Sequence, residues 1–269
     1  MQIALISDIH GNIEALDAVL ADIDKRAPGV KIICAGDIVG YGPDPQACIQ
    51  RLAFRSIPCV MGNHDEMVLG RRDFSRCVYS GIVAARWTRR NLDLHGLRFL
   101  HELPDVLNVT PEIVACHGTL ADPDRYISGE TESISALNQL ANRFPEANVL
   151  ICGHTHHAAT YCEDSGFLYC EPGSEFAIKS ERYSLINPGA VGQSRDGSLM
   201  ARYAIFNTKK CRVSFFGLDY DHEKTLDKLR RSGLVPDVDL QKATGTARYV
   251  EAIKVRWARL RYGSNPRFT

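Results

Sequence analysis

The chain contains five short apolar runs, and residues that commonly bind metal ions follow each run at once. Short runs rich in Ile, Val and Ala are typical of strands buried on both faces. The runs cover residues 3–6, 31–35, 57–61, 112–116 and 148–152. The polar residues that follow them occupy positions 8–12, 36–37, 62–65, 117–118 and 153–156. We therefore expect five strands, each ending in a polar loop.

Helical patterns separate these runs. Residues 12–26 place Ile13, Leu16, Val19, Leu20 and Ile23 at helical spacing, with Asn12 as the expected N-cap. Residues 45–55, 80–92 and 131–144 are also expected to be helical. Strands that alternate with helices predict an α/β fold. Ligands bind at the carboxyl ends of the strands in such folds, so we expect the polar clusters to converge on one site.

The second half of the chain has a different pattern. Strands and hairpins are expected at residues 158–162, 167–171, 201–207 and 212–216. We expect them to form a second sheet that packs against the first. Helices are expected at 221–232 and at 248–262, and the latter is basic. The chain is thus divided into a domain over 1–217 and a C-terminal helical extension over 218–269, packed on or trailing that domain.

The charge balance, the apolar runs and the cysteines limit the partners and the location that we expect. The 32 basic and 32 acidic residues balance, which argues against nucleic acid as a partner. No apolar run reaches the ~18 residues of a membrane span, so we expect a cytoplasmic protein without membrane contact. The nine cysteines form no C-x-x-C pair, and we expect free, mostly buried thiols.

The residue types in the polar clusters suit a pair of divalent metal ions. Two ions about 3.5–4 Å apart need one ligand that touches both, and the carboxylate of Asp37 is the candidate. The other candidate ligands are Asp8, His10, Asn63, His117, His154 and His156. Imidazole favours Mn, Fe or Zn over Mg or Ca, and Mn is the first expectation here. Any one of these motifs alone is weak, but five of them directly after five expected strands are not a coincidence.

These motifs, in this order, resemble the calcineurin-like metallophosphoesterase superfamily over residues 3 to about 217. The resemblance implies a four-layer α-β-β-α sandwich of two mixed sheets with flanking helices. It implies that Asp8, His10 and His156 hold one metal, that Asn63, His117 and His154 hold the other, and that Asp37 bridges them. It also implies that a bridging hydroxide attacks phosphorus in line. His64 would stabilise the transition state or protonate the leaving oxygen.

Two positions depart from the pattern of the Ser/Thr protein phosphatases in this superfamily. Those enzymes have an Asp and an Arg shortly after the bridging Asp, where this chain has Gly40 and Tyr41. The chain instead looks like a smaller bacterial and archaeal branch. That branch includes phosphodiesterases and relatives of diadenosine tetraphosphatases.

Three residues are candidates for contact with the substrate. Arg195, in a loop similar to one in that branch, is a candidate for phosphate binding, with a surface Arg beside a turn as the alternative. Tyr41 is expected either to stack on a base or to cover the core. Asn12 is a third candidate for substrate contact. Specificity is expected in the loops 40–46, 65–80, 119–130 and 189–197.

The sequence therefore predicts a binuclear-metal-dependent phosphoesterase. Its expected substrate is small, phosphorylated and nucleotide-like, and is cleaved at a phosphodiester or phosphoanhydride bond. The alternatives are a phosphomonoesterase, a protein phosphatase included, and a catalytically silent metal-bound scaffold. A nuclease is disfavoured by the neutral charge. The oligomeric state cannot be read from the sequence.

Overall fold

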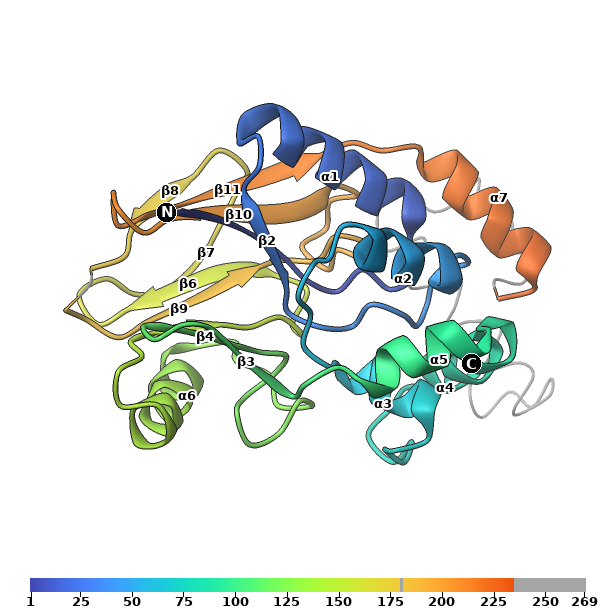
Figure 1. The fold of residues 1–269 in the computed structure, drawn as a ribbon, viewed down its shortest axis with the longest axis horizontal. Helices are drawn as coiled ribbons and strands as arrows, with labels where there is room; N and C mark the ends of the chain where they lie inside the picture. Colours follow the sequence, from blue (N-terminus) through green and yellow to red (C-terminus); the bar gives the residue numbers. More distant parts are fainter. Residues whose placement is uncertain (180, 235–269) are drawn as a thin grey trace, which may run out of the picture.

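The computed structural model describes residues 1–179 and 181–234, and its strands form two sheets that face each other (Figure 1). The first sheet has the order β2-β1-β10-β11-β8. Its strands are β2 (Lys31–Cys34), β1 (Gln2–Ile6), β10 (Ala201–Asn207), β11 (Arg212–Leu218) and β8 (Glu175–Ala177). Only β1 and β2 are parallel within it, so the sheet is mixed.

The second sheet has the order β3-β4-β5-β9-β6-β7. Its strands are β3 (Val106–Thr110), β4 (Ile113–Cys116), β5 (Val149–Ile151), β9 (Ser184–Pro188), β6 (Ala158–Cys162) and β7 (Gly166–Tyr169). β4, β5 and β9 run parallel, and the other pairs are antiparallel. This sheet is therefore mixed as well.

Helices cover the outer faces of both sheets (Figure 1). α1 (Ile13–Arg26) and α2 (Pro45–Phe54) lie over the first sheet, and α6 (Glu130–Arg143) lies over the second. α3 (Asn63–Leu69), α4 (Tyr79–Asn91) and α5 (Leu94–His101) pack together beside α2. α7 (His222–Ser232) packs against α1. The expected four-layer α-β-β-α sandwich is confirmed.

Strand β1 shows why its sequence is apolar at every position. Ile3 and Leu5 face the core between the two sheets, whereas Ala4 and Ile6 face the core beneath α1 and α2. A strand covered on both faces has no polar side, so its pattern does not alternate. The same burial holds β1 rigid up to the residue where its polar loop begins.

The helix boundaries agree closely with the sequence pattern. The side chain of Asn12 accepts a hydrogen bond from the Ala15 N–H at 3.1 Å, which confirms it as the N-cap of α1. α2, α4, α6 and α7 begin and end within one residue of the predicted ranges. The predicted basic helix at 248–262 lies outside the described residues. The division at residue 217 stays a prediction.

The predicted arrangement of the later strands is wrong. β6, β7 and β9 join β3–β5 in one sheet, whereas β8, β10 and β11 join β1 and β2 in the other. β10 pairs antiparallel with β1, and Phe206 lies opposite Ile3. The first strand of the domain and one of its last strands therefore lie side by side in one sheet. Strand pairing depends on contacts between distant segments, and the local pattern along 158–217 does not encode them.

The run at 57–61 also differs from its prediction, because it forms a single parallel bridge between Cys34 and Cys59 rather than a strand. Pro58 has no N–H to donate to a ladder. The Met61 N–H turns away and donates to the Pro104 carbonyl at 2.8 Å. The segment still runs beside β2 and brings Asn63 to the end of that strand.

The nine cysteines are free, and seven of them are buried, as predicted. No helix among the described residues is long and apolar enough to cross a membrane. Buried thiols here act as small apolar side chains.

Candidate metal centre

The candidate ligands lie where strands of both sheets end. Asp8 and His10 follow β1, Asp37 follows β2, His117 follows β4, and His154 and His156 follow β5. Asn63 is the first residue of α3. Seven non-glycine residues in the described part of the chain have a positive φ, and five of them are Asp8, His10, Asp37, His154 and His156. This conformation is uncommon for residues with a Cβ and tends to occur at functional sites.

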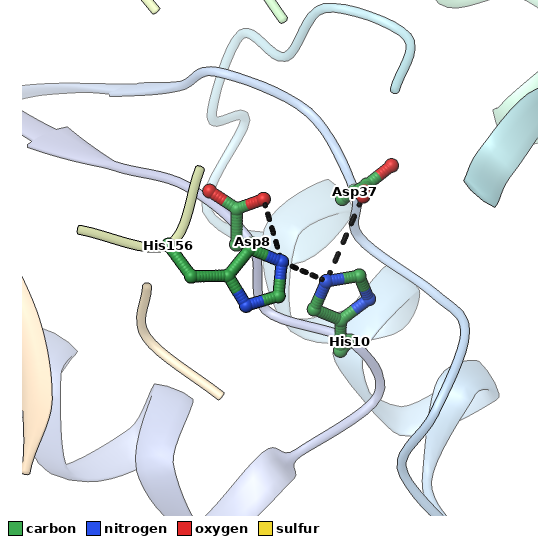
Figure 2. Close-up of side chains that lie close together, drawn as sticks. All are labelled: Asp8, His10, Asp37 and His156. Carbon is green, nitrogen blue, oxygen red and sulfur yellow. Dashed lines mark hydrogen bonds and ion pairs between the residues drawn. The ribbon is translucent and has the colours of Figure 1, made fainter. Parts of the chain in front are cut away.

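Asp8, His10, Asp37 and His156 form the first buried cluster (Figure 2). Nε2 of His10 lies 3.1 Å from Nε2 of His156 and 3.6 Å from Oδ2 of Asp37. Nε2 of His156 lies 3.4 Å from Oδ1 of Asp8. Four side chains from three loops thus point their donor atoms toward one another.

The second buried cluster comprises Asp37, His117 and His154. Nε2 of His117 lies 3.2 Å from Oδ2 of Asp37 and 3.1 Å from Oδ1 of Asn63, so Asn63 joins this group. Asp37 belongs to both clusters, and its Oδ2 is buried without a hydrogen-bond partner. A shared carboxylate between two such clusters is consistent with a binuclear metal site.

Backbone carbonyls orient three of the histidines. Nδ1 of His10 lies 3.2 Å from the Val39 carbonyl, and Nδ1 of His117 lies 2.8 Å from the Ala35 carbonyl. Nδ1 of His156 contacts the carbonyl of Gln193. A carbonyl accepts but cannot donate, so each Nδ1 bears the proton. The Nε2 atoms that face the clusters are then available for a metal ion.

The two carboxylates have opposite electrostatic behaviour. Burial raises the pKa of Asp8 to about 7, and the neighbouring Asp37 adds to the rise. Asp37 is equally buried, but the neighbouring positive charge of His117 holds its pKa well below the ordinary value. Burial opposes charge on His117, yet Asp37 and Asp8 raise its pKa to about 10. The charged carboxylate of Asp37 therefore attracts positive charge, as a ligand shared by two cations should.

His64 lies at the start of α3, beside the first cluster. Its ring centroid is 4.9 Å from that of His10 and 4.7 Å from that of Tyr41, and its Nδ1 has no hydrogen-bond partner. Burial lowers the pKa of His64 and outweighs the opposing effect of Asp37, so the ring is neutral. Gly40 has φ +132°, and a Cβ there would lie 2.9 Å from Nδ1 of His10 and 3.0 Å from Nδ1 of His64. No orienting side chain fits at position 40.

Tyr41 is 8% exposed and packs between the histidines and a small apolar cluster that contains Leu229 of α7. This burial supports the packing alternative for Tyr41 over a stacked base. The polar atoms of Asn12 are also in use. Its Oδ1 caps α1, and its Nδ2 donates to the Gly192 carbonyl and to the Tyr220 hydroxyl, each at 3.0 Å. A substrate contact by either residue stays a prediction.

Arg195 lies beside the first cluster and is not an isolated surface residue. Its charge acts on Asp8, His10 and His156. Its Nη1 donates to the hydroxyl of Tyr126 at 3.0 Å. The ring of Tyr126 stacks on His154, with centroids 4.3 Å apart and planes at 15°. Tyr126 lies in the loop 119–130, where specificity was expected, but an aromatic residue in a loop has no distinguishing sequence pattern.

Asp65 is a second residue whose role the sequence analysis missed. It is fully buried, and its carboxylate accepts hydrogen bonds from the backbone N–H groups of Ile38, Val39 and Gly62 at 3.3, 3.1 and 3.0 Å. These contacts tie the loop of Asp37 to the start of α3. The spacing could have indicated this role of Asp65, because an acidic residue three positions after an N-cap often binds the N-cap N–H.

Comparison with known proteins places this site in a family. The model of the calcineurin-like phosphoesterase superfamily domain matches residues 1–211. An uncharacterized protein of Methanocaldococcus jannaschii is 34% identical over 236 residues, which cover 86% of this chain and 93% of that one.

Two crystal structures show the same architecture. A metallophosphoesterase from Sphaerobacter thermophilus is 34% identical, with a TM-score of 0.72, over 87% of this chain and 95% of that one. A hypothetical protein from Pyrococcus horikoshii is 18% identical, with a TM-score of 0.70, over 94% of this chain and 96% of that one. The second likeness concerns the fold alone. The resemblance stated from the motifs is confirmed, and the chain belongs to the calcineurin-like phosphoesterase superfamily.

Proposed function

We propose that this metallophosphoesterase cleaves phosphodiester or phosphoanhydride bonds of a small, nucleotide-like substrate, using two divalent transition-metal ions, with manganese as the first candidate. Asp37 provides the main support. It is shared by both clusters, and its buried Oδ2 faces Nε2 of His117 and of His10 without hydrogen-bond alignment to either. A buried carboxylate oxygen without a partner is costly unless a cation meets it.

The facing histidines of the first cluster also fit a metal ion. Because Nδ1 of both His10 and His156 faces a carbonyl, the neutral rings direct lone pairs at each other from Nε2. The two Nε2 atoms lie 3.1 Å apart. Facing lone pairs repel, whereas a cation between them accepts both. Imidazole nitrogen favours Mn, Fe or Zn for this position.

In the proposed arrangement Asp8, His10 and His156 would hold one ion, Asn63, His117 and His154 would hold the other, and Asp37 would serve both. The ions, when bound, supply a hydroxide for in-line attack and neutralise charge on the phosphoryl oxygens. The protein keeps the ligands in place through strained backbone and carbonyl contacts. Because these ligands are buried and already in place, little reorganisation is needed when cations bind.

His64 is proposed to donate a hydrogen bond to the departing or equatorial oxygen. Burial keeps its ring neutral, so it acts as an N–H donor. It touches both the first cluster and Tyr41. Because no side chain fits at Gly40, nothing there raises the basicity of His64.

Arg195 is proposed to bind a phosphate oxygen. Within the described residues it forms no ion pair with a carboxylate, and its one hydrogen bond goes to Tyr126. Several of its N–H donors thus remain for an anion. A diester monoanion needs less positive charge than a monoester dianion, and Tyr41 contributes none. This balance favours the diester over the monoester.

The test is hydrolysis by the Mn²⁺-loaded protein of bis-p-nitrophenyl phosphate and p-nitrophenyl phosphate, with diadenosine tetraphosphate alongside. We expect faster cleavage of the diester or of the dinucleotide. Faster cleavage of the monoester would indicate a phosphomonoesterase instead. If none is cleaved while two metal ions per chain are bound, the protein is a scaffold.

His64→Ala separates catalysis from metal binding. We expect its turnover to fall by roughly 10²–10³-fold, the usual range for loss of one positioned hydrogen-bond donor, while metal content stays at the wild-type value. His95→Ala is the matched control, because His95 is exposed on α5. Full activity of His64→Ala would remove His64 from the proposed mechanism.

A further inference from the structure

Tyr126 combines exposure with direct contact to the candidate metal centre. Its side chain is 46% exposed, although its ring stacks on His154, which is 7% exposed. Stacking covers one face of the tyrosine ring only. One imidazole therefore separates a solvent-accessible aromatic ring from the second metal cluster.

The hydroxyl of Tyr126 is held by Arg195, the residue proposed to bind phosphate. The two side chains come from different loops, 119–129 after β4 and 189–200 after β9. At the edge of the site, the aromatic ring of Tyr126 thus lies next to the positively charged guanidinium of Arg195. A nucleotide has the same two features, because its base is planar and aromatic and its phosphate is anionic.

The loop that holds Tyr126 is fixed on both sides. Arg72, in the segment between α3 and α4, forms ion pairs with Asp124 and with Glu66 of α3. The Ser128 carbonyl, on the other side of Tyr126, accepts a hydrogen bond from the Tyr169 hydroxyl at 3.4 Å. The ion pairs of Arg72 lock the loop to the helix that begins with Asn63 and His64. A preorganised ring loses little entropy when a ligand stacks on it.

We propose that Tyr126 is a specificity-determining residue, which stacks on the nucleobase of the substrate while Arg195 binds the phosphate. The inference rests on the proposed phosphoesterase function and names the substrate class as nucleotides. Base–aromatic stacking tolerates every base, because each base has a π-face. Tyr126 therefore selects for a base without selecting which base.

The experiment compares two esters that release the same p-nitrophenolate: the p-nitrophenyl ester of thymidine 5′-monophosphate and methyl p-nitrophenyl phosphate. Wild-type, Mn²⁺-loaded protein should have the higher kcat/KM for the nucleotide ester. Tyr126→Leu should lower the ratio of the two kcat/KM values, nucleotide ester over methyl ester, roughly tenfold, because loss of the hydroxyl that contacts Arg195 affects both esters alike and cancels in this ratio. Tyr126→Phe retains the ring and should retain the preference. Phe54→Leu, at an exposed aromatic residue of α2, is the matched control.

A binding measurement separates this inference from the proposed function. Thymidine 5′-monophosphate and methyl phosphate are titrated into each Mn²⁺-loaded variant, and metal content is measured in parallel. A preference for the nucleotide that Tyr126→Leu loses at unchanged metal content supports the role of Tyr126, even if the wild type turns over neither ester. Equal losses for both ligands, or an unchanged preference in Tyr126→Leu, would overturn it.

Discussion

Oδ2 of Asp37 lies 3.2 Å from Nε2 of His117, inside a region that excludes solvent. The same oxygen lies 3.6 Å from Nε2 of His10 in the other cluster. One carboxylate oxygen thus faces both groups of histidines. The first prediction concerns this oxygen.

Asp37→Asn retains the size of the side chain but removes its charge. We expect metal content to fall from two ions per chain to one or fewer, because a neutral amide bridges two cations poorly. Turnover should fall by at least roughly a hundredfold. Elemental analysis and the diester assay provide the two measurements. Asp105→Asn, at an exposed loop position, should change neither value, and two ions retained in Asp37→Asn would refute the bridging role.

The second prediction concerns pH and the metal-free protein. Burial disfavours charge on His117, but Asp37 and Asp8 raise its pKa from 6.5 to about 10. The native state therefore keeps a proton that the unfolded chain releases. This stabilisation is complete below pH 6.5 and is lost as pH rises toward 10. The unfolding free energy should fall by up to about 1.4 kcal/mol per pH unit between about pH 7 and 8.5.

Within this pH window, the slope of the unfolding free energy reports mainly on His117. Burial lowers the pKa values of His10, His64, His154 and His156, and these act below it with the opposite sign. Burial raises the pKa values of Asp8 and Asp65 to about 7, so these add a slope of the same sign that ends near the lower edge of the window. Burial raises the pKa values of thiols such as Cys116, and these act above it. Urea unfolding in EDTA at several pH values measures the slope. His117→Gln should flatten the slope, and an equally steep slope in that variant would assign it to another group.

Much of the site could be predicted from sequence, because its determinants are local. A buried strand followed directly by Asp-x-His or Gly-Asp fixes both the element and the place of the ligand. Asp8 and Asp37 illustrate this, since each follows its strand within three residues. The parallel pairing of β1 with β2, and of β4 with β5, then brings these loops to one edge.

The pairing of the later strands and the contacts around the ligands could not be predicted. β9 includes Asn187 and ends at Pro188, so its sequence is typical of a loop, yet it lies between β5 and β6. The Asn187 side chain donates to the Gly153 carbonyl at 2.8 Å and so supports the loop of His154. Such contacts depend on tertiary packing, which a single sequence does not display.

Asp65 provides the third prediction. Asp65→Ala leaves three buried N–H groups, those of Ile38, Val39 and Gly62, without their acceptor. The variant should lose at least about 3 kcal/mol of unfolding free energy, because unsatisfied buried donors keep their full desolvation cost. Asp93→Ala, which removes the N-cap of α5, is the control and should lose about 1 kcal/mol. Urea unfolding compares the two, and equal losses would show that Asp65 is merely a helix cap.

The fourth prediction concerns Arg202 of β10, which is 2% exposed. Its Nε lies 3.3 Å from Oδ2 of Asp196, and the two groups form an ion pair without the alignment of a hydrogen bond. Its Nη2 donates a hydrogen bond to the Cys170 carbonyl at 2.6 Å. Asp196 follows Arg195 directly. Arg202 therefore anchors the loop that presents Arg195 and the Gln193 carbonyl to the site.

Arg202→Met should destabilise the fold by about 2–3 kcal/mol, because it leaves Asp196, mostly covered, without its cation. It should also raise KM for the diester more than it lowers kcat, since Arg195 loses its fixed position while the metal ligands remain. Adding Asp196→Asn should restore part of the stability, because the unpaired charge is gone. Arg212→Met, in an exposed pair on β11, should behave like the wild type. A variant of Arg202 that lost stability without a change in KM would confine Arg202 to a structural role and leave Arg195 positioned by Tyr126 alone.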